Sequence, residues 1–95
     1  MADNVSHDLE PGTPLDIERF THKSLQIIPD SGTYEVEVSN DNTTYFPIAS
    51  TVTVNTLIRS GDAATDLPHC VKFIRITETV AGTNPVFRFQ GHDPV

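Results

Sequence analysis

The chain has 95 residues and a formal net charge of −7, with 13 acidic residues against 6 basic ones. A chain of this length forms one domain with one thin core, which excludes a large enzyme with a deep active-site cleft. The lack of clustered lysine and arginine disfavours nucleic acid and anionic membranes as direct partners. One cysteine excludes an internal disulfide, and no apolar run approaches the ~20 residues that span a bilayer.

Residues 1–14 form a polar, acidic segment that Pro11, Gly12 and Pro14 interrupt. The segment has neither a helical nor an alternating period and no apolar signal core, which predicts an extended arm rather than an element. The hydrophobic share of the whole chain, 37%, also favours an arm or a fold completed by neighbouring chains. We therefore expect an arm over residues 1–14 and a single domain over residues 15–95.

Strand patterns dominate from Leu15 onward. The clearest one covers residues 33–39, where apolar side chains (Tyr34, Val36, Val38) alternate with glutamates (Glu35, Glu37). Asparagine and aspartate over residues 40–43 predict a turn, after which a strand over residues 44–48 pairs back as a hairpin. Pro47 within that strand favours a sheet edge or a bulge.

Further strands are predicted over residues 24–28, 50–58, 70–77 and 85–90, with turns at 29–32, 61–62, 67–68 and 81–84 and a helical turn over 62–67. Short strands with regularly spaced turns predict an all-β fold, a small antiparallel β-sandwich or jelly-roll-like barrel with an extended N-terminal arm. The predicted core is Leu25, Ile27, Tyr34, Val36, Val38, Phe46, Ile48, Val52, Val54, Phe73, Ile74, Ile76, Phe87 and Phe89.

Candidate catalytic and metal-binding residues have simpler structural explanations. Neighbours on a strand point to opposite faces, so His69 and Cys70 do not form a nucleophilic pair. The four histidines, which include His7 and His92, lack the spacing of a zinc site, although these two could meet across a subunit contact. Asn40-Asp41-Asn42 offers oxygen ligands for calcium but also fits a hairpin turn.

Glu35 and Glu37 share a strand face, as glycosidase carboxylates do, but an outward solvated face accounts for them more simply. No motif for nucleophilic catalysis or phosphate binding is present. The sequence therefore predicts a protein that is not an enzyme and that has no metal or cofactor.

Two stretches carry a resemblance to known proteins: a hairpin over residues 34–45 with the letters YEVEVSNDNTTY, and a strand over residues 71–76 with the letters VKFIRI. The pattern resembles small β-sandwich structural proteins of tailed-phage particles. Over residues 34–77 it is also similar to discoidin-like, galactose-binding-like jelly rolls. It departs from the latter at Asn42, where glycine is usual, and at Tyr45, where tryptophan is common, so no ligand residues are carried over.

The phage resemblance implies a virion structural protein that decorates or cements a capsid. Its expected partners are the major capsid protein and further copies of itself, with a closed trimer as the first association to test. It would be assembled in the host cytoplasm and lie on the particle exterior, where its acidic charge does not face packaged DNA. Contacts are expected from the arm and from strand edges near Pro47 or Phe87. The expected partner-binding residues are Val5, Leu9, Pro11, Pro14, Tyr45, Phe46 and Pro47.

Two alternatives stay open. One is a tail, fibre or head–tail connector component, which copy number per particle separates from a cement protein. The other is a small carbohydrate-binding module that uses Tyr45 and Phe46 as an aromatic platform. The role of the arm is tested by deletion of residues 1–14, which should leave a folded domain that no longer binds its particle.

Overall fold

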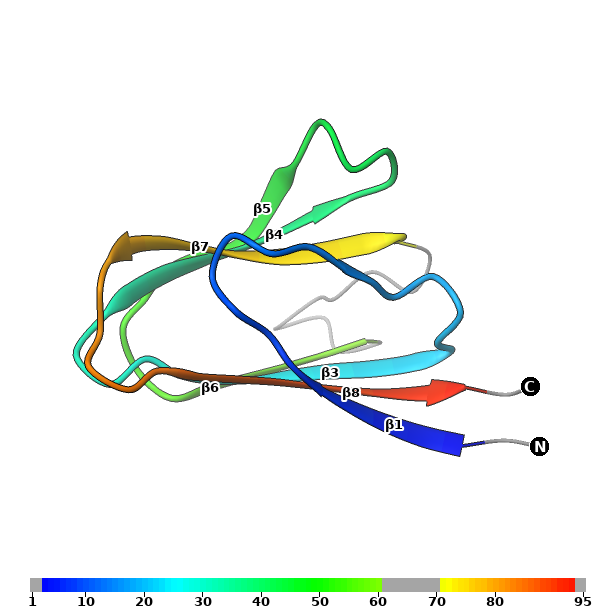
Figure 1. Ribbon diagram of the computed structural model, residues 1–95, viewed down its shortest axis with the longest axis horizontal. Coiled ribbons are helices and arrows are strands. Elements are labelled where there is room, and N and C mark those ends of the chain that lie inside the picture. The colour runs from blue at the N-terminus through cyan, green and yellow to red at the C-terminus, as the bar shows by residue number, and fades with distance from the viewer. Residues whose placement is uncertain (1–2, 61–70, 94–95) are drawn as a thin grey trace.

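The computed structural model describes residues 3–60 and 71–93 and is an antiparallel β-sandwich of two four-stranded sheets (Figure 1). The all-β prediction is therefore confirmed. The turns expected at 61–62 and 67–68, the helical turn over 62–67 and the pair His69–Cys70 lie outside the described residues. The first sheet has the order β1 (Asp3–Asp8), β8 (Val86–Asp93), β3 (His22–Ile28), β6 (Thr56–Arg59), and the second β2 (Leu15–Asp16), β7 (Phe73–Val80), β4 (Thr33–Ser39), β5 (Phe46–Val52).

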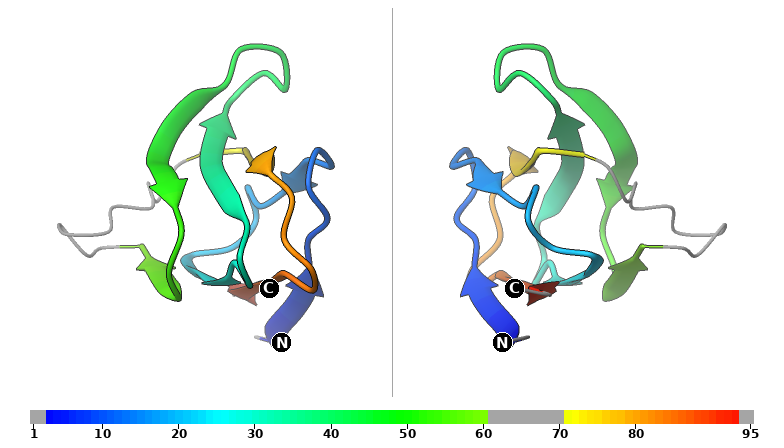
Figure 2. Two further views of the ribbon diagram at one scale, coloured as in Figure 1. Left: turned by 90° about the vertical axis from the view of Figure 1, so that its left-hand side faces the viewer. Right: turned by 90° about the vertical axis from the view of Figure 1, so that its right-hand side faces the viewer.

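The chain changes sheet at almost every connection. Among the strands that the structure describes, only β4 and β5 are consecutive and lie in the same sheet, and they form the hairpin that the sequence predicted. Every other ladder joins strands that are distant in sequence, such as β3 with β8 and β4 with β7. The two layers are seen end-on in Figure 2.

The core lies between the inward faces of the two sheets. Strand β4 has the predicted bounds, and its alternation places Tyr34, Val36 and Val38 inward. Most of the predicted core is buried as expected, with Ile48 and Phe73 only half-buried. The structure adds five buried apolar residues to the predicted core: Leu9, Ile17, Phe20, Ile58 and Val71.

The N-terminal segment differs from the expected arm. Asp3–Asp8 is strand β1, which pairs antiparallel with β8 from Asp3↔Asp93 to Asp8↔Arg88. An alternation does exist here, since Val5 is half-buried and Leu9 is buried, while the residues between them alternate in exposure. The apolar pattern of the sequence does not reveal this alternation, because the inward position between Val5 and Leu9 is the polar residue His7. The centroid of the His7 ring lies 6.5 Å from that of the Phe20 ring. The domain therefore includes part of residues 1–14.

The predicted strand over residues 50–58 is wrong. Strand β5 ends at Val52, and the chain crosses to the other sheet before β6 begins at Thr56. Val54, expected in the core, lies in this crossing and is 69% exposed. Residues on a connection between sheets do not follow the period of either strand, which is why the apolar pattern misled here.

Pro47 lies on an edge strand, where its missing N–H group is tolerated. Strand β5 is the edge of its sheet, and the β4–β5 register shifts twice beside it. Proline cannot donate a backbone hydrogen bond, and on an edge strand there is no second neighbouring strand that would need one. The same strand holds Thr51 at φ 56°, so the edge is irregular along its length.

The turns at 29–32 and 81–84 lie against each other at one end of the sandwich (left in Figure 1). Asp30 joins them, because its carboxylate accepts a hydrogen bond of 2.8 Å from the Asn84 N–H. The buried Tyr34 hydroxyl accepts a hydrogen bond of 2.9 Å from the Gly82 N–H. A Cβ at Gly82 would lie 2.5 Å from the Pro29 carbonyl oxygen, so this close backbone approach requires glycine.

Candidate binding site at the β4–β5 hairpin

The turn of the β4–β5 hairpin is organised by Ser39 and Asp41. The Asp41 carboxylate accepts hydrogen bonds from the Ser39 hydroxyl at 2.9 Å and from the N–H groups of Thr43 and Thr44 at 2.8 and 2.9 Å. These bonds, led by the one from Thr44, lower the pKa of Asp41 below its ordinary value. Asn42 has a φ of 59°, which asparagine tolerates. The hairpin-turn interpretation of Asn40-Asp41-Asn42 therefore accounts for the bonds of this segment.

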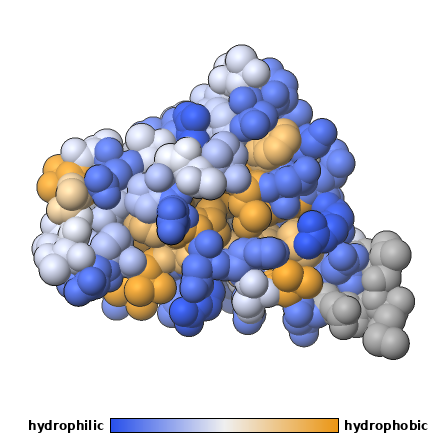
Figure 3. Space-filling model, viewed as in Figure 1, coloured by the Kyte–Doolittle hydropathy of each residue, from blue (hydrophilic) through white to orange (hydrophobic). Residues whose placement is uncertain are grey.

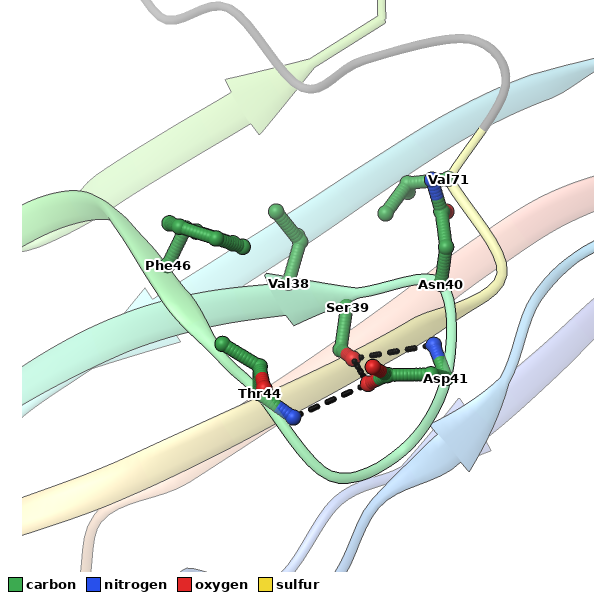
Figure 4. Close-up of a pocket in the computed structure, with 7 residues that line it drawn as sticks. All are labelled: Val38, Ser39, Asn40, Asp41, Thr44, Phe46 and Val71. Atoms are coloured by element: carbon green, nitrogen blue, oxygen red, sulfur yellow. Dashed lines mark hydrogen bonds between the residues drawn. The ribbon is translucent and has the colours of Figure 1, made fainter.

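A hollow with an apolar floor lies beside this turn. Its lining combines the apolar side chains of Val38, Phe46 and Val71 with polar groups of the turn, Ser39, Asn40, Asp41 and Thr44. Figure 4 shows the three apolar side chains on one side and the hydrogen-bonded turn on the other. Asn40 also accepts a hydrogen bond of 3.1 Å from the Lys72 N–H, which ties the turn to the segment that carries Val71.

Phe46 is a large apolar residue that lines this hollow but is mostly exposed to solvent. It pairs with the inward-facing Val38, yet it is 63% exposed rather than part of the core as predicted. The reason is visible in Figures 1 and 2, where the end of the hairpin projects beyond the body of the sandwich. An exposed phenylalanine above an apolar floor is a feature of surfaces that bind other proteins.

Tyr45 lies on the outer face of the second sheet and contacts a polar cluster. The Arg75 guanidinium carbon lies 3.7 Å from the centre of the Tyr45 ring, and a nitrogen of the same group lies 3.1 Å from the Glu37 carboxylate. Glu37 also accepts a hydrogen bond from the Thr77 hydroxyl. Partial burial raises the pKa of the Tyr45 phenol, whose hydroxyl donates a hydrogen bond to the Asn42 side-chain oxygen. This cluster fixes the hairpin against β7.

The cluster gives the fold a defined pH dependence. The pKa of Glu37 is lowered from 4.5, first by the hydrogen bond from Thr77 and then by Arg75, while desolvation acts in the opposite direction. A lowered pKa in the folded state contributes stability above pH 4.5 that is lost as the pH falls through the folded value. We expect Glu37→Gln to lower the free energy of unfolding by about 1 kcal/mol at pH 7.

The difference in the free energy of unfolding between the parent and Glu37→Gln should shrink toward zero as the pH falls through the lowered pKa of Glu37. Urea unfolding followed between pH 7 and pH 3 measures this convergence. Glu18→Gln removes an exposed carboxylate outside the cluster and serves as the control. A difference for Glu37→Gln that stays constant over this range would contradict the assignment.

The expected partner-binding residues fall into two groups. Tyr45, Phe46 and Pro47 are consecutive on the hairpin, with Phe46 and Pro47 exposed. Leu9 is buried in this domain's own core and its N–H donates to the Phe87 carbonyl at 2.8 Å. Of the others, Val5 is half-buried on β1, and Pro11 and Pro14 are exposed in the connection to β2. The structure therefore brings together the hairpin group only.

Sequence reasoning did not find that Val38 and Val71 line the same hollow as Phe46. Val38 was expected in the core, which is correct, because it is 7% exposed. Its proximity to Val71 follows from the β4–β7 register, in which Ser39 pairs with Phe73. No local pattern in the sequence encodes that register.

Comparison with protein-family models, with curated proteins and with solved structures finds no match. Among residues 3–60 and 71–93, no three histidine, cysteine, aspartate or glutamate side chains gather as a metal-binding group. The same residues contain no helix with the length and apolar character needed to cross a membrane.

Proposed function

We propose that this chain is a non-enzymatic structural protein of a virus particle, which decorates or cements the capsid of a tailed phage. The assignment to a virion rests on the resemblance carried by residues 34–45 and 71–76. The acidic surface and the compact two-sheet body are compatible with a subunit that sits on the outside of a shell. Its partners are the major capsid protein and further copies of itself.

The observation that carries the interaction is the apolar hollow at the hairpin. Phe46 is held 63% exposed on a hairpin that hydrogen bonds and the Arg75–Tyr45 contact keep in place. A preorganised aromatic side chain pays little conformational entropy on binding, so it is suited to anchor a protein contact. The polar rim of Asp41 and Thr44 supplies hydrogen-bonding groups around that anchor.

The N-terminal segment can contribute by strand exchange rather than as a free arm. Strand β1 has β8 as its one neighbour in the described sheet, and residues 9–14 connect it to β2. The same pairs would form if β1 joined the β8 strand of a neighbouring copy. Exchange preserves the burial of Leu9, because the core position that it fills is identical in both copies.

A second apolar region is the surface that we assign to contacts between copies of the chain. Figure 3 shows apolar side chains in the seam between the two sheets, framed by hydrophilic ones. Val5 and Leu15 are partly buried apolar residues that pack against the core. This seam is the surface on which a neighbouring copy would rest in a closed trimer.

Replacement of Phe46 tests the proposal. Phe46→Asp should weaken binding to capsids that lack this protein by about thirtyfold or more, since a lost aromatic anchor is worth about 2 kcal/mol. Val80→Asp is the matched control, because Val80 is 55% exposed and lies at the opposite end of β7 from the hairpin. Co-sedimentation with capsids measures both. Equal binding by Phe46→Asp and the parent would contradict the proposal.

A substitution at Tyr45 distinguishes the carbohydrate-binding alternative from the proposed function. One face of its ring is covered by the Arg75 guanidinium, which leaves less of the ring to stack on a sugar. Tyr45→Ala should abolish glycan affinity if the protein is a carbohydrate-binding module. In our proposal the same variant retains most of its capsid binding, since the anchor is Phe46 and the hydrogen bonds to Asp41 still hold the turn.

A further inference from the structure

Two histidines that are 70 positions apart meet on the outer face of the first sheet. His22 on β3 and His92 on β8 are direct register partners, and their ring centroids are 6.2 Å apart. His22 is exposed and His92 is half-buried, so both rings are accessible from solvent. They border a surface hollow that is also lined by polar residues and by two cationic ones, namely Asn4, Ser24, Ser60, Gln90, Lys23 and Arg59.

The hydrogen bonds around the pair define which ring nitrogens are available. The Asn4 side-chain oxygen lies 2.9 Å from His92 Nδ1, and an amide oxygen only accepts, so Nδ1 carries the proton. Thr21 donates its one hydroxyl proton to the His92 carbonyl at 3.3 Å. The Thr21 hydroxyl oxygen also lies 3.4 Å from His22 Nδ1. In the neutral tautomer that the bond to Asn4 favours, His92 leaves its Nε2 atom free to bind a metal ion.

We propose that His22 and His92 chelate a divalent transition-metal ion through their Nε2 atoms. With metal–nitrogen distances of about 2.0–2.1 Å, two imidazoles on one ion have ring centroids about 5 Å apart at a tetrahedral angle and about 6.4 Å apart when they are trans; the observed 6.2 Å lies toward the trans end of that range. Neutral imidazole is a ligand for zinc, copper and nickel, whereas calcium and magnesium require oxygen donors. Water completes the coordination on this open face.

Asn4 acts as a positioning residue in this site. A histidine ligand usually donates its second ring N–H to an oxygen acceptor, which fixes the ring and raises the basicity of the ligating nitrogen. Asn4 supplies that acceptor from β1, the register partner of His92 on the other side of β8. Three strands therefore build the site, and none of the three residues lies near another in sequence.

This site could not be predicted from the sequence, because a two-histidine chelate on a sheet has no characteristic spacing. The expectation of no metal site rested on the absence of short motifs. Register pairing between β3 and β8 replaces such a motif, since it sets the distance between the two rings directly.

Titration of the full chain with Cu²⁺ and Zn²⁺, each as the metal alone, tests the proposal. Calorimetry should give one ion per chain, and the Cu²⁺ electron paramagnetic resonance spectrum should report two imidazole nitrogens. His22→Gln and His92→Gln should each weaken binding by about a hundredfold, because the second nitrogen binds at a high effective concentration. Asn4→Ala should weaken it by about tenfold with both nitrogens retained.

His7→Gln and His69→Gln are the matched controls, and each should leave affinity and spectrum unchanged. Thermal unfolding by circular dichroism confirms that every variant is folded, and added Zn²⁺ should raise the Tm of the parent but not that of His22→Gln. The proposal is overturned if the parent binds neither ion at submillimolar concentration. It is equally overturned if His69→Gln abolishes binding or if His22→Gln leaves it intact.

Discussion

Removal of residues 1–9 is expected to lower the free energy of unfolding by about 3–5 kcal/mol and the Tm by more than about 15 °C. The deletion takes away all six register pairs between β1 and β8 and the buried side chain of Leu9. It also turns β8 into an edge strand. Small domains are stable by only about 5–15 kcal/mol, so this loss is a large part of the total.

Circular dichroism during heating and urea titration measures the effect of that deletion. Leu9→Ala is the companion variant, since it removes one buried side chain but keeps the β1–β8 ladder, and about 2–3 kcal/mol is expected for it. A truncated chain that unfolds at the same temperature as the parent would show that residues 1–9 are a separate arm. That outcome is the one expected from the sequence pattern alone.

Phe20→Ala is expected to lower the free energy of unfolding by about 3–5 kcal/mol. Phe20 is 2% exposed, its ring centroid lies 5.4 Å from that of Phe89, and it covers Gly91 so closely that a Cβ there would lie 2.4 Å from the ring. Truncation to alanine leaves a cavity in this tightly packed position. The residue lies between β2 and β3 and therefore also holds the connection between the two sheets.

Phe46→Ala provides the matched control for Phe20→Ala. Both variants remove the same side chain, but Phe46 is 63% exposed, so its loss should change the free energy of unfolding by less than about 1 kcal/mol. Urea denaturation of the two variants side by side makes the comparison. Equal destabilisation would mean that Phe46 belongs to the core, as its sequence pattern suggests.

The parts of the fold that the sequence predicts are those encoded by neighbouring residues. The alternation over residues 33–39 and the Asn-Asp turn that follows depend on local contacts, and both are found where expected. The buried position of Phe20 depends instead on Phe89 and Gly91, which lie about 70 residues away. Six of the seven connections between consecutive described strands change sheet, so most strand pairings had no local signal in the sequence.

The candidate site likewise combines residues that local sequence patterns identify with residues that only distant strand pairing brings together. Tyr45, Phe46 and Pro47 were expected to bind a partner because they follow a predicted turn and Pro47 favours a sheet edge, but the strand pattern also placed Phe46 in the core, where the structure does not bury it. The apolar floor that Val71 adds, and the His22–His92 pair, depend on registers between distant strands. Such registers are set by the packing of two complete sheets and not by any short segment.

The most direct test of the proposed function is quantitative mass spectrometry of purified virus particles from the source of this chain, with copies counted per particle. A decoration or cement protein occupies the repeating shell lattice, so on the order of hundreds of copies are predicted. Between six and a few dozen copies would place the chain at a vertex, tail or fibre and contradict a cement role. Absence from the particles would contradict the virion assignment as a whole.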